Sequence, residues 1–124
     1  MMERSVRLCI FRAKTTPSCY RYIGVDQVLL YDNNEDGGAQ AAELSDFIQD
    51  GFLTYYTVPG QAMQVPVYHH CLVHSAETYT WLAAIDIDEF LVVEDEGLRL
   101  RQPKDQLKAV LRDFRFYPGA SFAT

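Results

Sequence analysis

Two carboxylates two residues apart, Asp86 and Asp88, follow a short apolar run that begins at Trp81. A bounded run of this kind is typical of a buried strand. Because a buried carboxylate is costly unless it is paired, hydrogen-bonded or bound to a metal ion, we expect both to lie where the strand leaves the core. Side chains two apart in a strand point the same way, about 7 Å from each other. Two anions this close repel, and a divalent cation with oxygen ligands and open positions for a diphosphate would resolve the conflict.

A second group of polar residues follows an earlier apolar run. Residues 25–31 read as a buried strand, and Asp32, Asn33 and Asn34 then begin a cluster of turn-forming residues that extends to Gly38. A polar loop at the carboxyl end of a buried strand is where open α/β sheets place ligands. Asp32 could equally cap the turn or the next helix. Both roles stay open for it.

Together, the blocks RYIGVDQVLLYDNN and WLAAIDIDEFLVV resemble glycosyltransferase family 92 and its relatives, including family 2-like proteins, within the GT-A fold. The resemblance extends roughly from residue 20 to residue 117, and the chain resembles such a protein truncated at both ends. It implies that Asp86 and Asp88 bind Mn²⁺ or Mg²⁺ on the UDP-sugar side, and that Asp32 contacts the nucleoside. Glu89 would either orient the loop or a metal-bound water, or be a solvated, ion-paired residue.

The same resemblance implies a function. It implies metal-dependent transfer of a hexose, often galactose, from a UDP-sugar donor to a glycan or glycoprotein acceptor, with inversion. The metal ion would neutralise charge on the leaving diphosphate. The family's members are usually anchored in the Golgi membrane by a segment that precedes the catalytic domain and is absent from this sequence.

Two other functions fit parts of the pattern. Phosphatases of the haloacid dehalogenase class also place an Asp-x-Asp pair after four apolar residues and use the first Asp as a nucleophile. That class has Thr or Val at the position where this chain has Phe90. The chain could also be a non-catalytic, truncated remnant of a glycosyltransferase. No catalytic base is identified before Thr124, so we expect no transferase activity from this chain alone.

The elements that must position these residues alternate between strands and helices. We expect a helix over 39–50, a strand over 52–58, a helix over 61–77 and a helix from Pro103 onward. Val65, Tyr68, Cys71 and Leu72 form the predicted apolar stripe of the third segment. This order predicts a three-layer α/β domain with a mostly parallel sheet, the nucleotide-binding half of a GT-A (Rossmann-like) fold, over residues 20–124. Residues 1–19 match the family poorly, although residues 5–11 could form a short strand.

Composition narrows the function classes. The net charge of −6 argues against nucleic-acid binding, which usually needs a basic face. No apolar run of eighteen or more residues encodes a transmembrane helix. Three cysteines are an odd and sparse set, so we expect buried or semi-buried thiols and no disulfide framework.

Three histidines lie close together in the 61–77 segment. His70 and His74 have the spacing of the zinc-binding pair in metalloprotease helices, but the glutamate that follows the first histidine there is absent. We therefore expect that these two residues and His69 do not hold a metal ion tightly.

Overall fold

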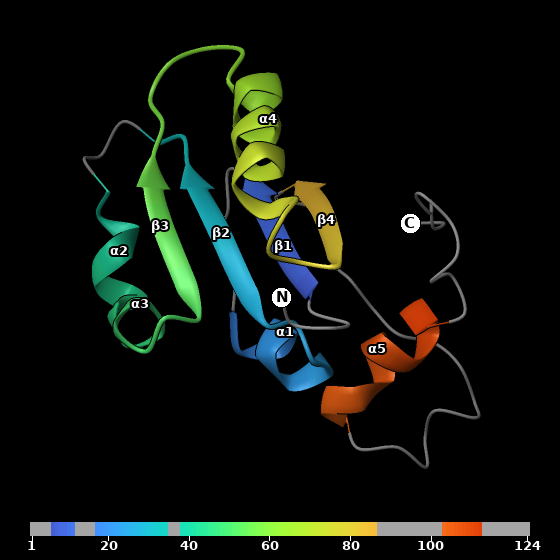
Figure 1. Cartoon of the computed structure of the whole chain (residues 1–124). Helices are drawn as coiled ribbons and strands as arrows, with labels where there is room; N and C mark the ends of the chain where they lie inside the picture. The colour runs from blue at the N-terminus through green and yellow to red at the C-terminus, as the bar shows by residue number, and fades with distance from the viewer. Residues whose placement is uncertain (1–5, 12–16, 35–37, 87–102, 113–124) are drawn as a thin grey trace.

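The fold is that of a computed structural model, which describes residues 6–11, 17–34, 38–86 and 103–112 (Figure 1). In chain order the elements are β1 (Val6–Phe11), α1 (Pro17–Ile23), β2 (Gln27–Asp32), α2 (Gln40–Glu43), α3 (Ser45–Gln49), β3 (Leu53–Thr57), α4 (Gln64–Ser75), β4 (Trp81–Asp86) and α5 (Pro103–Arg112). The strands form one sheet in the order β3-β2-β1-β4, and every neighbouring pair is parallel. The predicted α/β fold with a parallel sheet is therefore confirmed.

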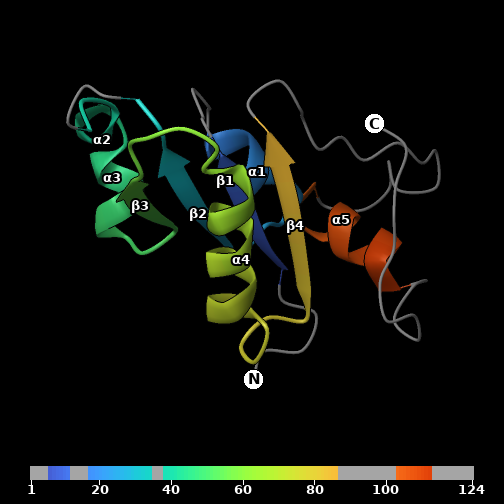
Figure 2. The same cartoon turned by 90° about the horizontal axis from the view of Figure 1, so that it is seen from above.

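Helices cover both faces of this sheet, which gives the predicted three layers. Helix α4 lies across one face, and α1, α3 and α5 lie on the other (Figure 2). Side chains alternate along each strand, so β1 serves both cores: Leu8 and Ile10 enter the larger core, and Cys9 and Phe11 pack beneath α4. The strand within residues 1–19 is thus a central strand of the sheet.

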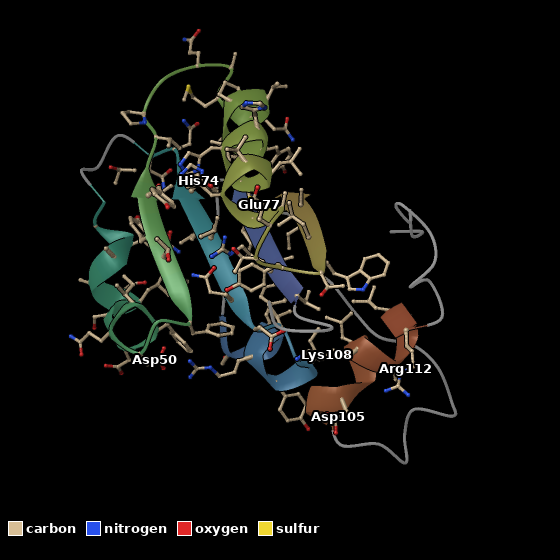
Figure 3. All side chains as sticks on the ribbon, viewed as in Figure 1. Asp50, His74, Glu77, Asp105, Lys108 and Arg112 are labelled. Carbon is tan, nitrogen blue, oxygen red and sulfur yellow. A yellow bond between two sulfur atoms is a disulfide. The ribbon has the colours of Figure 1, made fainter. Side chains whose placement is uncertain are left out.

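Polar contacts also fasten the layers at their margins. In α5, Lys108 donates a hydrogen bond from Nζ to Oδ1 of Asp26 over 2.8 Å, just before β2 begins. The labelled residues of α5 show its position beside the sheet (Figure 3). Among the described residues, no helix combines the length and the apolar character that crossing a membrane would require.

The predicted single helix over 39–50 is instead two short helices, α2 and α3. Leu44 separates them, with φ −103° and ψ 9°, outside helical geometry. At this break the Leu44 side chain enters the larger core, and Phe47 and Ile48 of α3 pack against the same core. Burial of these side chains therefore outweighs continuation of one straight helix.

The predicted apolar stripe of α4 is wrong in two of its four members. Val65 is 78% exposed and Leu72 is 54% exposed. The buried residues are instead Val67, Cys71 and Ser75, which follow each other at intervals of four. Ser75 can be buried because its hydroxyl accepts a hydrogen bond from Arg7 Nη1 over 3.0 Å. Contacts with the sheet, rather than the apolar residues alone, decide which face of α4 is buried.

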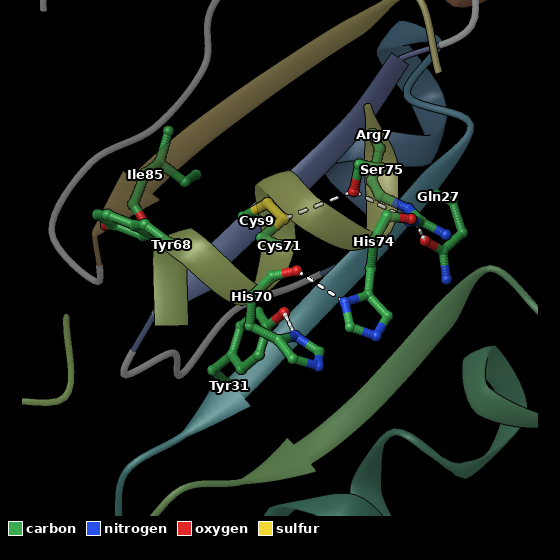
Figure 4. The surroundings of a disulfide bond; sticks show 10 residues. All are labelled: Arg7, Cys9, Gln27, Tyr31, Tyr68, His70, Cys71, His74, Ser75 and Ile85. Atoms are coloured by element: carbon green, nitrogen blue, oxygen red, sulfur yellow. Dashed lines mark hydrogen bonds between the residues drawn. A yellow bond between two sulfur atoms is a disulfide. The ribbon is translucent and has the colours of Figure 1, made fainter. Parts of the chain in front are cut away.

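The expectation that all cysteines are thiols is also wrong. Cys9 of β1 and Cys71 of α4 form a disulfide, with their Cα atoms 6.3 Å apart (Figure 4). Cys19 is a free, exposed cysteine. The pair is 62 residues apart in sequence, and only the passage of α4 over β1 brings the two together. Cysteine spacing alone does not reveal such a crossing.

Candidate functional site

The carboxyl ends of the strands meet at one edge of the sheet, and the described residues Asp32 and Asp86 lie there. Phe11 at the end of β1 pairs with Tyr31 of β2 on one side and with Asp86 of β4 on the other. Asp32 follows Tyr31 directly and pairs with Thr57 of β3. The ends of β2 and β4 are therefore separated by one strand, which corresponds to roughly 10 Å between their backbones. Asp88 and Glu89 lie outside the described residues.

Asp32 is fully buried, and its two carboxylate oxygens serve different partners. Oδ1 accepts the backbone N–H of Asn34 over 2.8 Å, which closes a turn directly after β2. Oδ2 accepts the hydroxyl of Tyr55, from the neighbouring strand β3. The turn-capping role that the sequence left open is thus observed. Contact with a nucleoside stays a prediction.

Asn33, to which the sequence assigned no separate role, connects two loops at this edge. Its side-chain amide donates to the carbonyl oxygen of Val58 over 2.7 Å and to that of Gly60 over 3.0 Å. Both carbonyls belong to the connection between β3 and α4. An asparagine after a strand was the only sequence signal, and it could not identify the partner carbonyls.

Tyr31 links β2 to α4. Its hydroxyl lies 2.6 Å from Nδ1 of His70, and the two rings meet edge to face (Figure 4). Burial, assisted by the neighbouring Tyr56, raises the pKa of Tyr31 well above its ordinary value. Burial, and then His74, lower the pKa of His70. We infer that a protonated Tyr31 donates to Nδ1 of a neutral His70, whose own ring proton is on Nε2.

His70 and His74 of α4 are engaged in contacts within the protein. The His74 ring stacks on that of His70 with centroids 3.9 Å apart, and His74 Nδ1 lies 3.0 Å from the His70 carbonyl oxygen. His69 is exposed. Across the part of the chain that the structure describes, no three histidine, cysteine or acidic residues are grouped to hold a metal ion.

A shallow hollow lies at the opposite, amino-terminal edge of the sheet. Its lining comprises Arg21, Val25, Asp26, Asp50, Gly51 and Phe52. Arg21 donates to Asp50 over 2.7 Å, and this hydrogen bond lowers the pKa of that carboxylate. Its guanidinium also lies 4.4 Å from the Phe52 ring centroid. These contacts account for the hollow as part of the packing around α1, away from the strand ends that carry the candidate site.

Comparison with known proteins addresses the predicted resemblance. The family model for glycosyltransferase family 92 matches residues 18–121. A family 92 protein of Oryza sativa subsp. japonica is 35% identical over 69 residues, which are 56% of this chain and 12% of that protein. One from Arabidopsis thaliana is 25% identical over 96 residues, 77% of this chain and 16% of that protein.

A third family 92 protein, from Ricinus communis, is 30% identical over 71 residues, covering 57% of this chain and 12% of that protein. The chain thus spans only 12–16% of the length of these relatives. No solved structure matches it. The match supports a glycosyltransferase family over the phosphatase class. Because the family model covers most of the sequence and includes both polar blocks, the chain belongs to glycosyltransferase family 92.

Proposed function

We propose that this chain provides the donor-binding part of a metal-dependent glycosyltransferase, which transfers a hexose from a UDP-sugar to a glycan acceptor. UDP-galactose is the first donor to test. The observation that carries the proposal is the meeting of the β2 and β4 ends at one edge of a parallel sheet. Parallel α/β sheets bind ligands beyond the carboxyl ends of their strands. Membership of family 92 supports a transferase that uses this edge.

Asp86 and Asp88 are the proposed ligands of Mn²⁺ or Mg²⁺. Their carboxylate oxygens suit a hard divalent cation, and Asp86 ends β4 at the edge where a donor would lie. When bound, the cation would neutralise negative charge on the diphosphate leaving group. A pair of carboxylates leaves the remaining coordination positions for diphosphate oxygens and water, as is usual for Mg²⁺ in nucleotide sites.

Asp32, at the end of β2, is the proposed nucleoside contact. Its Oδ1 is held by the Asn34 N–H, which fixes the orientation of the carboxylate. Its Oδ2 now accepts the Tyr55 hydroxyl. A hydroxyl group of the UDP-sugar would therefore replace the Tyr55 hydroxyl as the partner of Oδ2, with no change in the turn. Such an exchange conserves the number of hydrogen bonds to a buried carboxylate, which avoids the cost of leaving it unpaired.

Binding of UDP, with and without Mn²⁺, tests the proposal most directly because no catalytic base has been identified. Asp86→Asn and Asp88→Asn keep the side-chain shape but remove the charge. We expect each to weaken Mn²⁺-dependent UDP binding at least about tenfold in isothermal titration calorimetry. Asp105→Asn, an exposed residue of α5, is the matched control and should bind as the unmodified chain does. Equal UDP affinity in EDTA, or in both site variants, would show that the site is misassigned.

A further inference from the structure

One side chain of α4 contacts the end of the strand that leads into the acidic pair. The Tyr68 hydroxyl donates to the carbonyl oxygen of Ile85 over 3.1 Å, and Ile85 directly precedes Asp86 (Figure 4). The Tyr68 ring also meets the Phe11 ring edge to face, with centroids 6.4 Å apart. Phe11 is the register partner of Asp86 on β1. Tyr68 therefore touches the residue before Asp86 and the residue beside it.

The helix that carries Tyr68 is itself held firmly against the sheet. Cys71, less than one turn further along α4, is joined by the disulfide to Cys9 of β1. Val67, the residue before Tyr68, is only 2% exposed and packs in the same core. The Tyr68 hydroxyl is thus presented by a backbone that is covalently tied to the strand next to β4. A hydrogen-bond donor fixed in this way can hold the acceptor carbonyl group of Ile85 in place.

We propose that Tyr68 is a positioning residue for Asp86, an inference that rests on the proposed metal-binding role of Asp86 and Asp88. Among the described residues, β4 has a strand neighbour on one side only, β1. The Tyr68 hydrogen bond supplies a further restraint on the last carbonyl before the pair. Partners that orient metal ligands typically change metal affinity 10- to 100-fold when they are removed. Tyr68 acts through the backbone, so its effect belongs at the lower end of this range.

Tyr68→Phe removes the hydroxyl and keeps the ring that packs on Phe11. We expect this variant to raise the Kd for UDP in the presence of Mn²⁺ about tenfold, and to leave the affinity for UDP in EDTA unchanged. Mn²⁺ titration followed by electron paramagnetic resonance should show the same loss. Hydrogen exchange of the metal-free chain gives an independent readout: the peptide that covers β4 should exchange faster in the variant.

The matched control is Tyr31→Phe, which removes another hydroxyl that joins the sheet to α4 but does not reach β4. Loss of Mn²⁺-dependent affinity in Tyr68→Phe alone supports the positioning role. Equal losses in both variants would indicate general loosening of α4 and overturn it. If Asp86→Asn abolishes Mn²⁺-dependent binding while Tyr68→Phe matches the unmodified chain, only the positioning role fails. If the unmodified chain shows no Mn²⁺-dependent UDP binding, the proposed function fails and the positioning role with it.

Discussion

Three consecutive side chains at the end of β2 fasten three different parts of the molecule. Tyr31 reaches His70 on α4, Asp32 accepts the hydroxyl of Tyr55 on β3, and Asn33 holds the connection between β3 and α4. Alternation along the strand sends Tyr31 and Asp32 to opposite faces. Both are buried, so each polar group needs a partner inside the protein. The block that looked like a ligand loop in sequence is therefore also a structural junction.

The partial burial of His70, and then the neighbouring His74, make stability sensitive to pH because both lower the pKa of His70. The pKa of His70 is lowered in the folded chain, so at mildly acidic pH the unfolded chain binds more protons. His70 then contributes its full stabilisation above its ordinary pKa near 6.5, and this contribution is lost as the pH falls toward the lower folded pKa. The free energy of unfolding, measured with urea from pH 7.5 to 5, should decline on acidification.

In His70→Gln this decline should be shallower, because the titrating group is gone. His69→Gln, an exposed histidine of the same helix, should keep the slope of the unmodified chain. Identical slopes for all three proteins would contradict the assignment of a neutral His70.

At the scale of elements, local patterns identified β2, β3 and β4 but neither the strand order of the sheet nor how the helices pack. Apolar runs that end in turn residues correctly placed β2, β3 and β4, and the alternation with helices predicted the parallel pairing of β2 with β3. The position of β1 between β2 and β4 was not predicted. The buried face of α4 could not be predicted this way, because Ser75 is buried through its bond with Arg7 while Leu72 stays exposed.

At the candidate site too, the sequence predicted the positions of residues along the chain but not the contacts that depend on packing. Chain order indicated that Asp32 and Asp86 end their strands at one edge. The contacts of Asn33 and Tyr68 could not be found, because each joins segments that meet only after the sheet and α4 have packed.

The connection between β3 and α4 depends on Asn33. It contains Gly60 with φ +116° and Ala62 with φ +55°, a left-handed conformation that is unfavourable for a residue with a side chain. Asn33→Asp removes both donors and faces a carboxylate toward the carbonyls of Val58 and Gly60. We expect a loss of about 1–3 kcal/mol in the free energy of unfolding, and faster hydrogen exchange over residues 58–63.

Asn34→Asp makes the same chemical change one residue away, on an exposed side chain whose backbone N–H makes the turn bond to Asp32. It should leave the exchange of residues 58–63 unaltered. Equal hydrogen exchange of residues 58–63 in the two variants would refute the proposal that Asn33 holds this connection in place.

For the whole molecule, the α4 layer differs from the opposite layer in what holds it. Counting only residues that the structure describes, the larger core contains twelve buried residues and is shared by α1, α5 and the α2–α3 region. The core beneath α4 contains six described residues, and two of these are the disulfide pair Cys9 and Cys71. With less apolar burial, the α4 layer relies more on its covalent link. That link lies between a central strand and the helix that carries Tyr68, so the disulfide affects both stability and the candidate site.

Removing the disulfide should therefore destabilise the whole chain. The two cysteines are 62 residues apart, and closing a loop of this length stabilises a fold by about 4 kcal/mol, mainly by restricting the unfolded chain. Cys9→Ala with Cys71→Ala, or reduction with dithiothreitol, should lower the free energy of unfolding by up to about this amount, as measured by urea denaturation. Cys19→Ala, which leaves the disulfide intact, is the control.

Thiol titration of the unfolded, unreduced chain should find Cys19 alone. Reaction of all three cysteines would mean that the link is absent, and the stability of the α4 layer would then have to come from its packing and its hydrogen bonds with β1, β2 and β4.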